Sequence, residues 1–143
     1  MALATAEITT LIDKIITALN TAEIEGVVGV YFGDQEAYSA YPVICVGAPP
    51  LLNETFPVMA KGGTHDEVYS IPIVTYVSYA DTLANNKQIY NIDGAIKTAL
   101  RTDYLDDYVY IIDIIQTRYA FAVKGNVNLR IAETTIQYTK RIS

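Results

Sequence analysis

The chain has 143 residues, a net charge of −6 and a pI near 4.6, with 51% hydrophobic and 18% charged residues. This composition excludes general disorder, which requires low hydrophobicity and high charge. The acidic balance lacks the electrostatic footprint of a nucleic-acid binder, and it disfavours attraction to anionic membranes. The single cysteine, Cys45, allows no intrachain disulfide, so a reducing compartment such as a cytoplasm is expected.

The length suits one domain over residues 1–143. A chain of this size buries roughly 68–70% of its unfolded surface, which is enough for a real core. We find no internal repeat, low-complexity tract or linker. No apolar run approaches the ~18 residues of a membrane span, so no membrane partner is expected.

The first third of the chain predicts one helix and two strands. Residues 5–20 carry apolar side chains at helical spacing, which indicates an amphipathic helix. Residues 24–32 predict a strand weakened by Gly26 and Gly29. Residues 41–47 predict a second short strand, in which Pro42 fits only near the start or on an edge.

Residues 48–64 break this pattern. Three prolines and two glycines prevent a regular element over most of the segment, although a short strand is expected near residues 55–60. An apolar connection longer than about 12–15 residues is often functional. Either it folds back over its own core or a partner subunit covers it. The candidate subunit-interface residues are Leu51, Leu52, Phe56, Val58, Met59 and, just beyond the loop, Tyr69.

Residues 65–79 form the longest strand-like run, and we expect the other elements to pair with it. Alternation places one set of side chains on one face, namely Tyr69, Ile71, Ile73, Val77 and Tyr79, and a second set on the other, namely Val68, Val74 and Tyr76. A second amphipathic helix follows, beginning at the capping residues Asn85–Asn86 or later at Asn91, and ending near Arg101. Residues 108–117 and 126–138 predict two closing strands, with a turn at 124–126.

The predicted order is therefore α-β-β-(β)-β-α-β-β. Short links between strands favour antiparallel pairing. Two amphipathic helices can cover one face of a single sheet. The expected fold class is α+β, with a single, mostly antiparallel sheet and both helices on one face.

Candidate chemical sites are few. His65 and Glu67 could share a metal ion, because alternate strand residues point to the same face, but no third ligand is evident. Asp106–Asp107 is better interpreted as a polar turn than as a catalytic carboxylate pair. Cys45 lies between apolar neighbours and is expected to be core filler. We therefore expect no enzyme activity, cofactor or metal. A small enzyme or regulatory binding domain using the His65/Glu67 strand edge stays as an alternative.

The order of elements resembles the tail terminator and minor tail proteins of long-tailed bacteriophages, and the related neck proteins. The resembling features are the helix around residues 8–19, the run Phe56-Pro-Val-Met-Ala, the strand Tyr69-Ser-Ile-Pro-Ile-Val-Thr-Tyr-Val, the helix at 92–100 and two closing strands. The resemblance covers nearly the whole chain. The Pro-rich stretch at 47–63 departs from it, so a terminator and a neck or completion protein both stay open.

The resemblance implies a virion protein that assembles in the host cytoplasm and acts at the head–tail junction. It implies a closed ring, commonly a hexamer, that caps the finished tail tube and joins it to the neck. The implied partners are other copies of the chain, the tail tube protein and neck or connector proteins. DNA would pass through the ring without specific binding, because an acidic wall repels phosphate. The alternative within this class is a neck adaptor, stopper or tail-completion protein.

Overall fold

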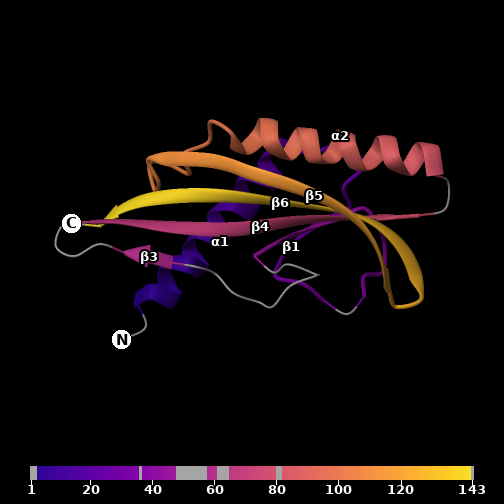
Figure 1. Ribbon diagram of the computed structural model, residues 1–143, viewed down its shortest axis with the longest axis horizontal. Coiled ribbons are helices and arrows are strands. Elements are labelled where there is room, and N and C mark those ends of the chain that lie inside the picture. Colours follow the sequence, from indigo (N-terminus) through magenta and orange to yellow (C-terminus); the bar gives the residue numbers. More distant parts are fainter. Residues whose placement is uncertain (1–2, 36, 48–57, 61–64, 80–81, 143) are drawn as a thin grey trace.

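The computed structural model describes residues 3–35, 37–47, 58–60, 65–79 and 82–142 (Figure 1). It contains two helices and six strands in the predicted order. Their bounds are α1 Leu3–Ala22, β1 Gly29–Phe32, β2 Val43–Val46, β3 Val58–Ala60, β4 His65–Ser78, α2 Thr82–Leu100, β5 Ile111–Lys124 and β6 Val127–Ile142. The fold is α+β, as the sequence predicts.

One mixed sheet organises the molecule, with the strand order β1-β2-β4-β6-β5 and β3 paired to one end of β4. β4 pairs with β6 over its whole length, so the two run side by side along the long axis of the molecule (Figure 1). The sheet is mostly antiparallel, as predicted, and the exception is the pair β1 and β2, which are parallel. β2 runs in the same direction as β1, so the connection between them has to return to the end of the sheet at which β1 begins.

Both helices pack on the same face of the sheet. The main core joins the apolar stripe of α1, the stripe of α2 and the odd-numbered residues of β4 in one cluster. Fully buried members include Leu11, Ile15, Ile71, Ile92 and Ile96. The alternation predicted for residues 65–79 is therefore confirmed on this side of β4.

The other face of the sheet carries a second apolar cluster, which includes Val74, Tyr76 and Cys45. Tyr38 and Tyr41, from the link between β1 and β2, pack against this cluster. The ring of Tyr38 lies 6.0 Å from that of Tyr76 and 5.9 Å from that of Tyr41. The sheet is thus covered on both faces, by helices on one and by an aromatic link on the other.

Several predicted boundaries differ from the structure. β1 begins only at Gly29, because Gly26 has a φ of +86° and ends the extended chain before it. α2 begins at Thr82, so Asn85 and Asn86 lie inside the helix and do not cap it. An Asn residue inside a helix is less favourable than Ala by under ~0.7 kcal/mol, and the tertiary packing of a helix outweighs a cost of this size. β5 starts three residues later than expected and continues to Lys124.

Candidate functional site: an apolar edge strand and a pocket at the opposite edge

β5 forms one edge of the sheet and, among the residues that the structure describes, pairs only with β6. At 14 residues it spans roughly 48 Å. Six of the ten exposed large hydrophobic side chains of the described chain lie between residues 110 and 123, so exposed apolar surface concentrates on this edge. We call this set the β5 strip; it comprises Tyr110, Ile111, Ile115, Tyr119, Phe121 and Val123.

Three members of the strip share one face. The register pairs Tyr119 with Ala132, and Ala132 belongs to the helix-side core. Because side chains alternate along a strand, Phe121 and Val123 project to the helix-bearing side as well. Their exposed fractions are 60% and 64%. A compact apolar surface therefore lies on the helix-bearing side of the hairpin formed by β5 and β6.

The side chain of Arg130 packs against the aromatic rings of this surface. The guanidinium carbon of Arg130 lies 4.5 Å from the ring centroid of Phe121 and 5.7 Å from that of Tyr119. Arg130 is itself buried, and its Nη1 donates to the carbonyl of Ala120 at 3.2 Å. The ring of Tyr79 meets Phe121 edge-on at 5.1 Å. Such rigid clusters of aromatic rings and arginine are typical of the energetic centres of protein interfaces.

Tyr119 is also tied to α2. Its hydroxyl donates to Asp93 Oδ2 at 3.1 Å, and that carboxylate is ion-paired to Lys97 at 2.8 Å. The hydroxyl of Thr134, from the sheet below, donates to the other oxygen of Asp93. Burial and the nearby Asp93 carboxylate raise the pKa of Tyr119 to about 12, so it stays a neutral donor. Tyr119 is therefore bonded to α2 directly and, through Asp93 and Thr134, linked to β6 as well.

The charged side chains of β5 do little to prevent another chain from pairing with this edge. Arg118 is ion-paired to the buried Glu133 on β6, and Lys124 lies 3.2 Å from Asp34. Free edges are usually guarded by outward charges, prolines or bulges. On β5 the exposed charges are Asp113 and the ion-paired Arg118, and a bulge interrupts the register between Ile114 and Gln116. The nine residues after the bulge pair in regular register with β6, and Tyr119, Phe121 and Val123 among them expose an apolar surface that is suited to a protein contact.

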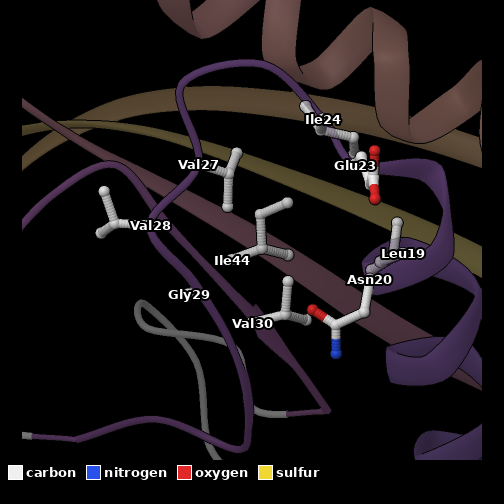
Figure 2. A pocket seen from close by; sticks show the side chains of 9 residues that line it. All are labelled: Leu19, Asn20, Glu23, Ile24, Val27, Val28, Gly29, Val30 and Ile44. Atoms are coloured by element: carbon white, nitrogen blue, oxygen red, sulfur yellow. The ribbon is translucent and has the colours of Figure 1, made fainter.

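A pocket lies at the opposite edge of the sheet, between the end of α1, the following turn and β1 (Figure 2). Its volume is about 310 Å³. Leu19, Val27, Val30 and Ile44 provide apolar walls, and Asn20, Glu23 and the exposed Val28 lie around them, as Figure 2 shows. The molecule thus has an apolar projection at one sheet edge and, at the other, an open hollow lined by both apolar and polar groups.

The interface residues predicted from the sequence fall mostly where the structure gives no account. Leu51, Leu52 and Phe56 lie outside the described residues. Val58 and Met59 belong to β3, which pairs with β4, but their side chains are not described. Tyr69 is 1% exposed and packs in the helix-side core of its own chain. Its side chain therefore has no surface to offer a partner in this conformation.

The candidate chemical residues stay apart. The backbones of His65 and Glu67 pair with Ile142 and Lys140, and their side chains are not described. Asp106 and Asp107 occupy a left-handed turn, with φ values of +56° and +63°, which confirms the predicted polar turn. Cys45 is fully buried, which confirms the prediction that its side chain fills part of the core. Within the described ranges no group of three or more His, Cys, Asp or Glu side chains is placed to hold a metal ion.

The sequence contains a signal for the β5 strip that the strand prediction missed. Tyr119, Phe121 and Val123 alternate with smaller residues and lead directly into the turn at Gly125–Asn126. This is a period-two pattern ending in a hairpin turn. Ending the strand at residue 117 left these three side chains out of the expected sheet. Neither described helix is long and apolar enough to cross a membrane.

Comparisons with known proteins include a likeness to a solved structure. No family model and no curated protein matches the chain. Among solved structures, a chain from the virion of a native gene transfer agent particle aligns with 90% of this chain and 84% of its own length. The sequence identity is 11% and the TM-score is 0.39, which is below the level that establishes a shared fold.

Proposed function

We propose that this protein is a virion structural protein that assembles into a closed ring, a hexamer in the simplest case, at the head–tail junction. In this role it ends the tail tube and joins it to the neck, and it acts through surfaces and not through catalysis or a cofactor. The single observation that carries the proposal is the β5 strip. An exposed, long, apolar sheet edge is a site for pairing with another chain.

Two further features support this role. The α-β-β-β-β-α-β-β order of the structure is the order on which the resemblance to tail terminators was based. A ring of six chains would carry a charge of −36, from six times −6. An acidic wall repels phosphate, which would let DNA slide through the ring without sticking to it.

The test uses particle images of the purified protein, alone and mixed with tail tubes from a terminator-deficient phage of the same kind. We expect rings of defined symmetry, seated at one end of the tubes. A stable monomer that binds no tube would overturn the proposal.

A second role in the same class is a neck adaptor, stopper or tail-completion protein acting on the head side. The resemblance extends to those proteins as well, and the apolar edge would serve either role. A pull-down against tail tubes and DNA-filled heads in parallel separates the two. Capture of heads alone would assign the second role, and capture of tubes alone the first.

A further inference from the structure

We infer that the outer edge of β5 pairs with the same edge of a second copy, antiparallel and across a two-fold axis at Ala120. The inference goes beyond the proposed function, because it names what covers the β5 edge in the free protein. A two-fold contact uses the same surface on both copies, so it joins two copies and no more. Three such pairs would supply the six copies of the proposed ring.

The backbone of β5 leaves one row of hydrogen-bonding groups on its outer side. Lys124 and Val127 close the two-residue turn of the hairpin, and such a closing pair exchanges its backbone hydrogen bonds. Because bonded and non-bonded pairs alternate in an antiparallel ladder, Val123 turns its N–H and C=O away from β6. Its neighbour across the ladder, Asn128, confirms this alternation, since the Asn128 carbonyl accepts from the N–H of Tyr79 on the β4 side at 2.8 Å. The same alternation turns three more residues outward, namely Thr117, Tyr119 and Phe121.

The regular part of β5 is complementary to itself. It runs from Gln116, just after the bulge, to Lys124, just before the turn. When Ala120 of one copy faces Ala120 of the other, the two regular stretches coincide over their whole length. The bulge and the turn then lie at the ends of the paired region and do not interrupt it.

This register also matches the side chains. Tyr119 lies opposite Phe121 of the second copy, and Thr117 lies opposite Val123. Pairs of aromatic and β-branched residues that face each other across two strands stabilise a sheet. All four side chains are on the helix-bearing side, and all four backbones point outward, so the hydrogen bonds and the apolar contacts form together.

The charges of the edge do not oppose the pairing. Arg118 and Lys124 are each ion-paired to an acidic side chain of their own chain, so the edge carries little net charge. In the two-fold register Arg118 lies opposite Ala122, and Lys124 lies opposite Gln116. No like charges face each other directly, which would destabilise the pair. A second β5 edge therefore matches this one better than a strongly charged strand of another protein would.

The contact is small in area but rich in hydrogen bonds. Nine residues span roughly 31 Å, and a sheet with its side chains is on the order of 10 Å thick, so each copy buries about 300 Å². This is below the ~800 Å² per partner of a standard interface and is typical of weak contacts. Four outward residues on each of two copies, however, donate about eight backbone hydrogen bonds, as many as a standard interface contains. We therefore expect a dimer that forms at micromolar concentrations.

The first experiment places a cysteine on the two-fold axis. Ala120→Cys should form disulfide-linked dimers under mild oxidation, because directly opposed residues of a non-bonded antiparallel pair have Cα atoms about 4.5 Å apart, within the range of a disulfide. Gln116→Cys is the control, since the two copies of this exposed residue would lie roughly 27 Å apart. Cys45 is fully buried, and burial raises the pKa of its thiol to about 12, so it does not compete.

The second experiment tests the backbone bonds with two substitutions of the exposed Val123. Val123→Pro removes an outward N–H, which an edge strand tolerates, whereas Val123→Ala keeps it. Sedimentation equilibrium should show that the proline variant dimerises about tenfold or more weakly than the alanine variant, because each dimer loses two hydrogen bonds. Circular dichroism checks that both variants are folded.

A wild-type chain that stays monomeric at high micromolar concentration would overturn the inference. Disulfide dimers of Gln116→Cys that form as readily as those of Ala120→Cys would also overturn it, and so would equal dimerisation of the proline and alanine variants. A protein that dimerises as described but binds no tail tube would contradict the proposed function and leave this pairing standing.

Discussion

Asp34 joins three parts of the chain through one carboxylate. Tyr38 donates to one of its oxygens at 2.8 Å and Tyr76 to the other at 2.6 Å. The ammonium of Lys124, at the end of β5, lies 3.2 Å away. The β1–β2 link, the centre of β4 and the tip of the hairpin therefore depend on one side chain that the sequence did not single out.

Replacing Asp34 with alanine should lower the free energy of unfolding by about 2–4 kcal/mol, because the buried Tyr76 hydroxyl, the half-buried Tyr38 hydroxyl and the Lys124 ammonium lose this acceptor. Urea denaturation monitored by circular dichroism measures this change. Asp113→Ala is the matched control, since Asp113 is exposed on β5, and it should change stability by less than ~0.5 kcal/mol. Equal effects of the two substitutions would contradict the role given to Asp34.

Cys45 should be inert in the folded protein. Its side chain is fully buried, and burial raises the pKa of the thiol from 9.0 to about 12. A shift of three units lowers the thiolate fraction near pH 8 roughly a thousandfold. Labelling by a thiol reagent should be slower in native buffer than in concentrated urea by at least that factor. Rapid labelling of the native protein would contradict this expectation. It would show that the segment carrying Tyr38, whose hydroxyl contacts the Cys45 sulfur, opens easily.

At the scale of elements, the β5–β6 hairpin is held at its tip as well as along its length. The turn residues Gly125 and Asn126 both have positive φ, +53° and +64°, as a tight two-residue hairpin turn requires. A Cβ atom at Gly125 would lie 2.8 Å from that of Ala37 in the β1–β2 link. The tip therefore rests directly on the link that covers the second face of the sheet.

Replacement of glycine by alanine should have opposite effects on stability at Gly125 and at Gly94. Gly125→Ala should destabilise the protein by about 1–3 kcal/mol, because of the positive φ and the clash with Ala37. Gly94→Ala should stabilise it by about 0.5–1 kcal/mol, since Gly94 lies inside α2 and a Cβ there meets nothing within 4 Å. Thermal denaturation measures both changes. A destabilising Gly94→Ala would contradict the exposed position of that residue on α2.

The predicted elements were reliable where one periodicity covered a long run. The stripes of both helices and the alternation of β4 were confirmed, because burial on one face imposes a period that local sequence records. The far half of β5 was missed, because exposed Tyr, Phe and Val alternate there without a buried face to confirm them. The parallel pairing of β1 was also missed, since pairing direction depends on where a link crosses the sheet.

At the scale of the whole molecule, stability should fall in alkali. Burial raises the pKa of Cys45 from 9.0 and of Tyr119 from 10.0, each to about 12, and it also raises the pKa values of Tyr38 and Tyr76. A group with a raised pKa favours the folded state while it is protonated. This contribution is complete below about pH 9 and is lost as the pH rises toward 12.

Urea denaturation at intervals from pH 8 to pH 11 should therefore show constant stability at first and a decline above about pH 9. Cys45→Ala provides the control, because removing the thiol leaves the tyrosines, whose unfolded pKa is 10.0. The decline should then begin about one pH unit later. A maximum of stability near pH 10 in the wild type would contradict the direction of these shifts.

The sequence by itself determined the element order, the fold class and the absence of a recognisable catalytic motif, because hydrophobic periodicity and turn chemistry are local properties of the chain. It directed attention to the apolar segment 48–64, whose central residues lie outside the described structure. Only the tertiary structure decided which strand became the open edge. Strand order brings Phe121 to one edge and the pocket around Val27 and Ile44 to the other, because pairing between strands far apart in sequence sets the edges of a sheet.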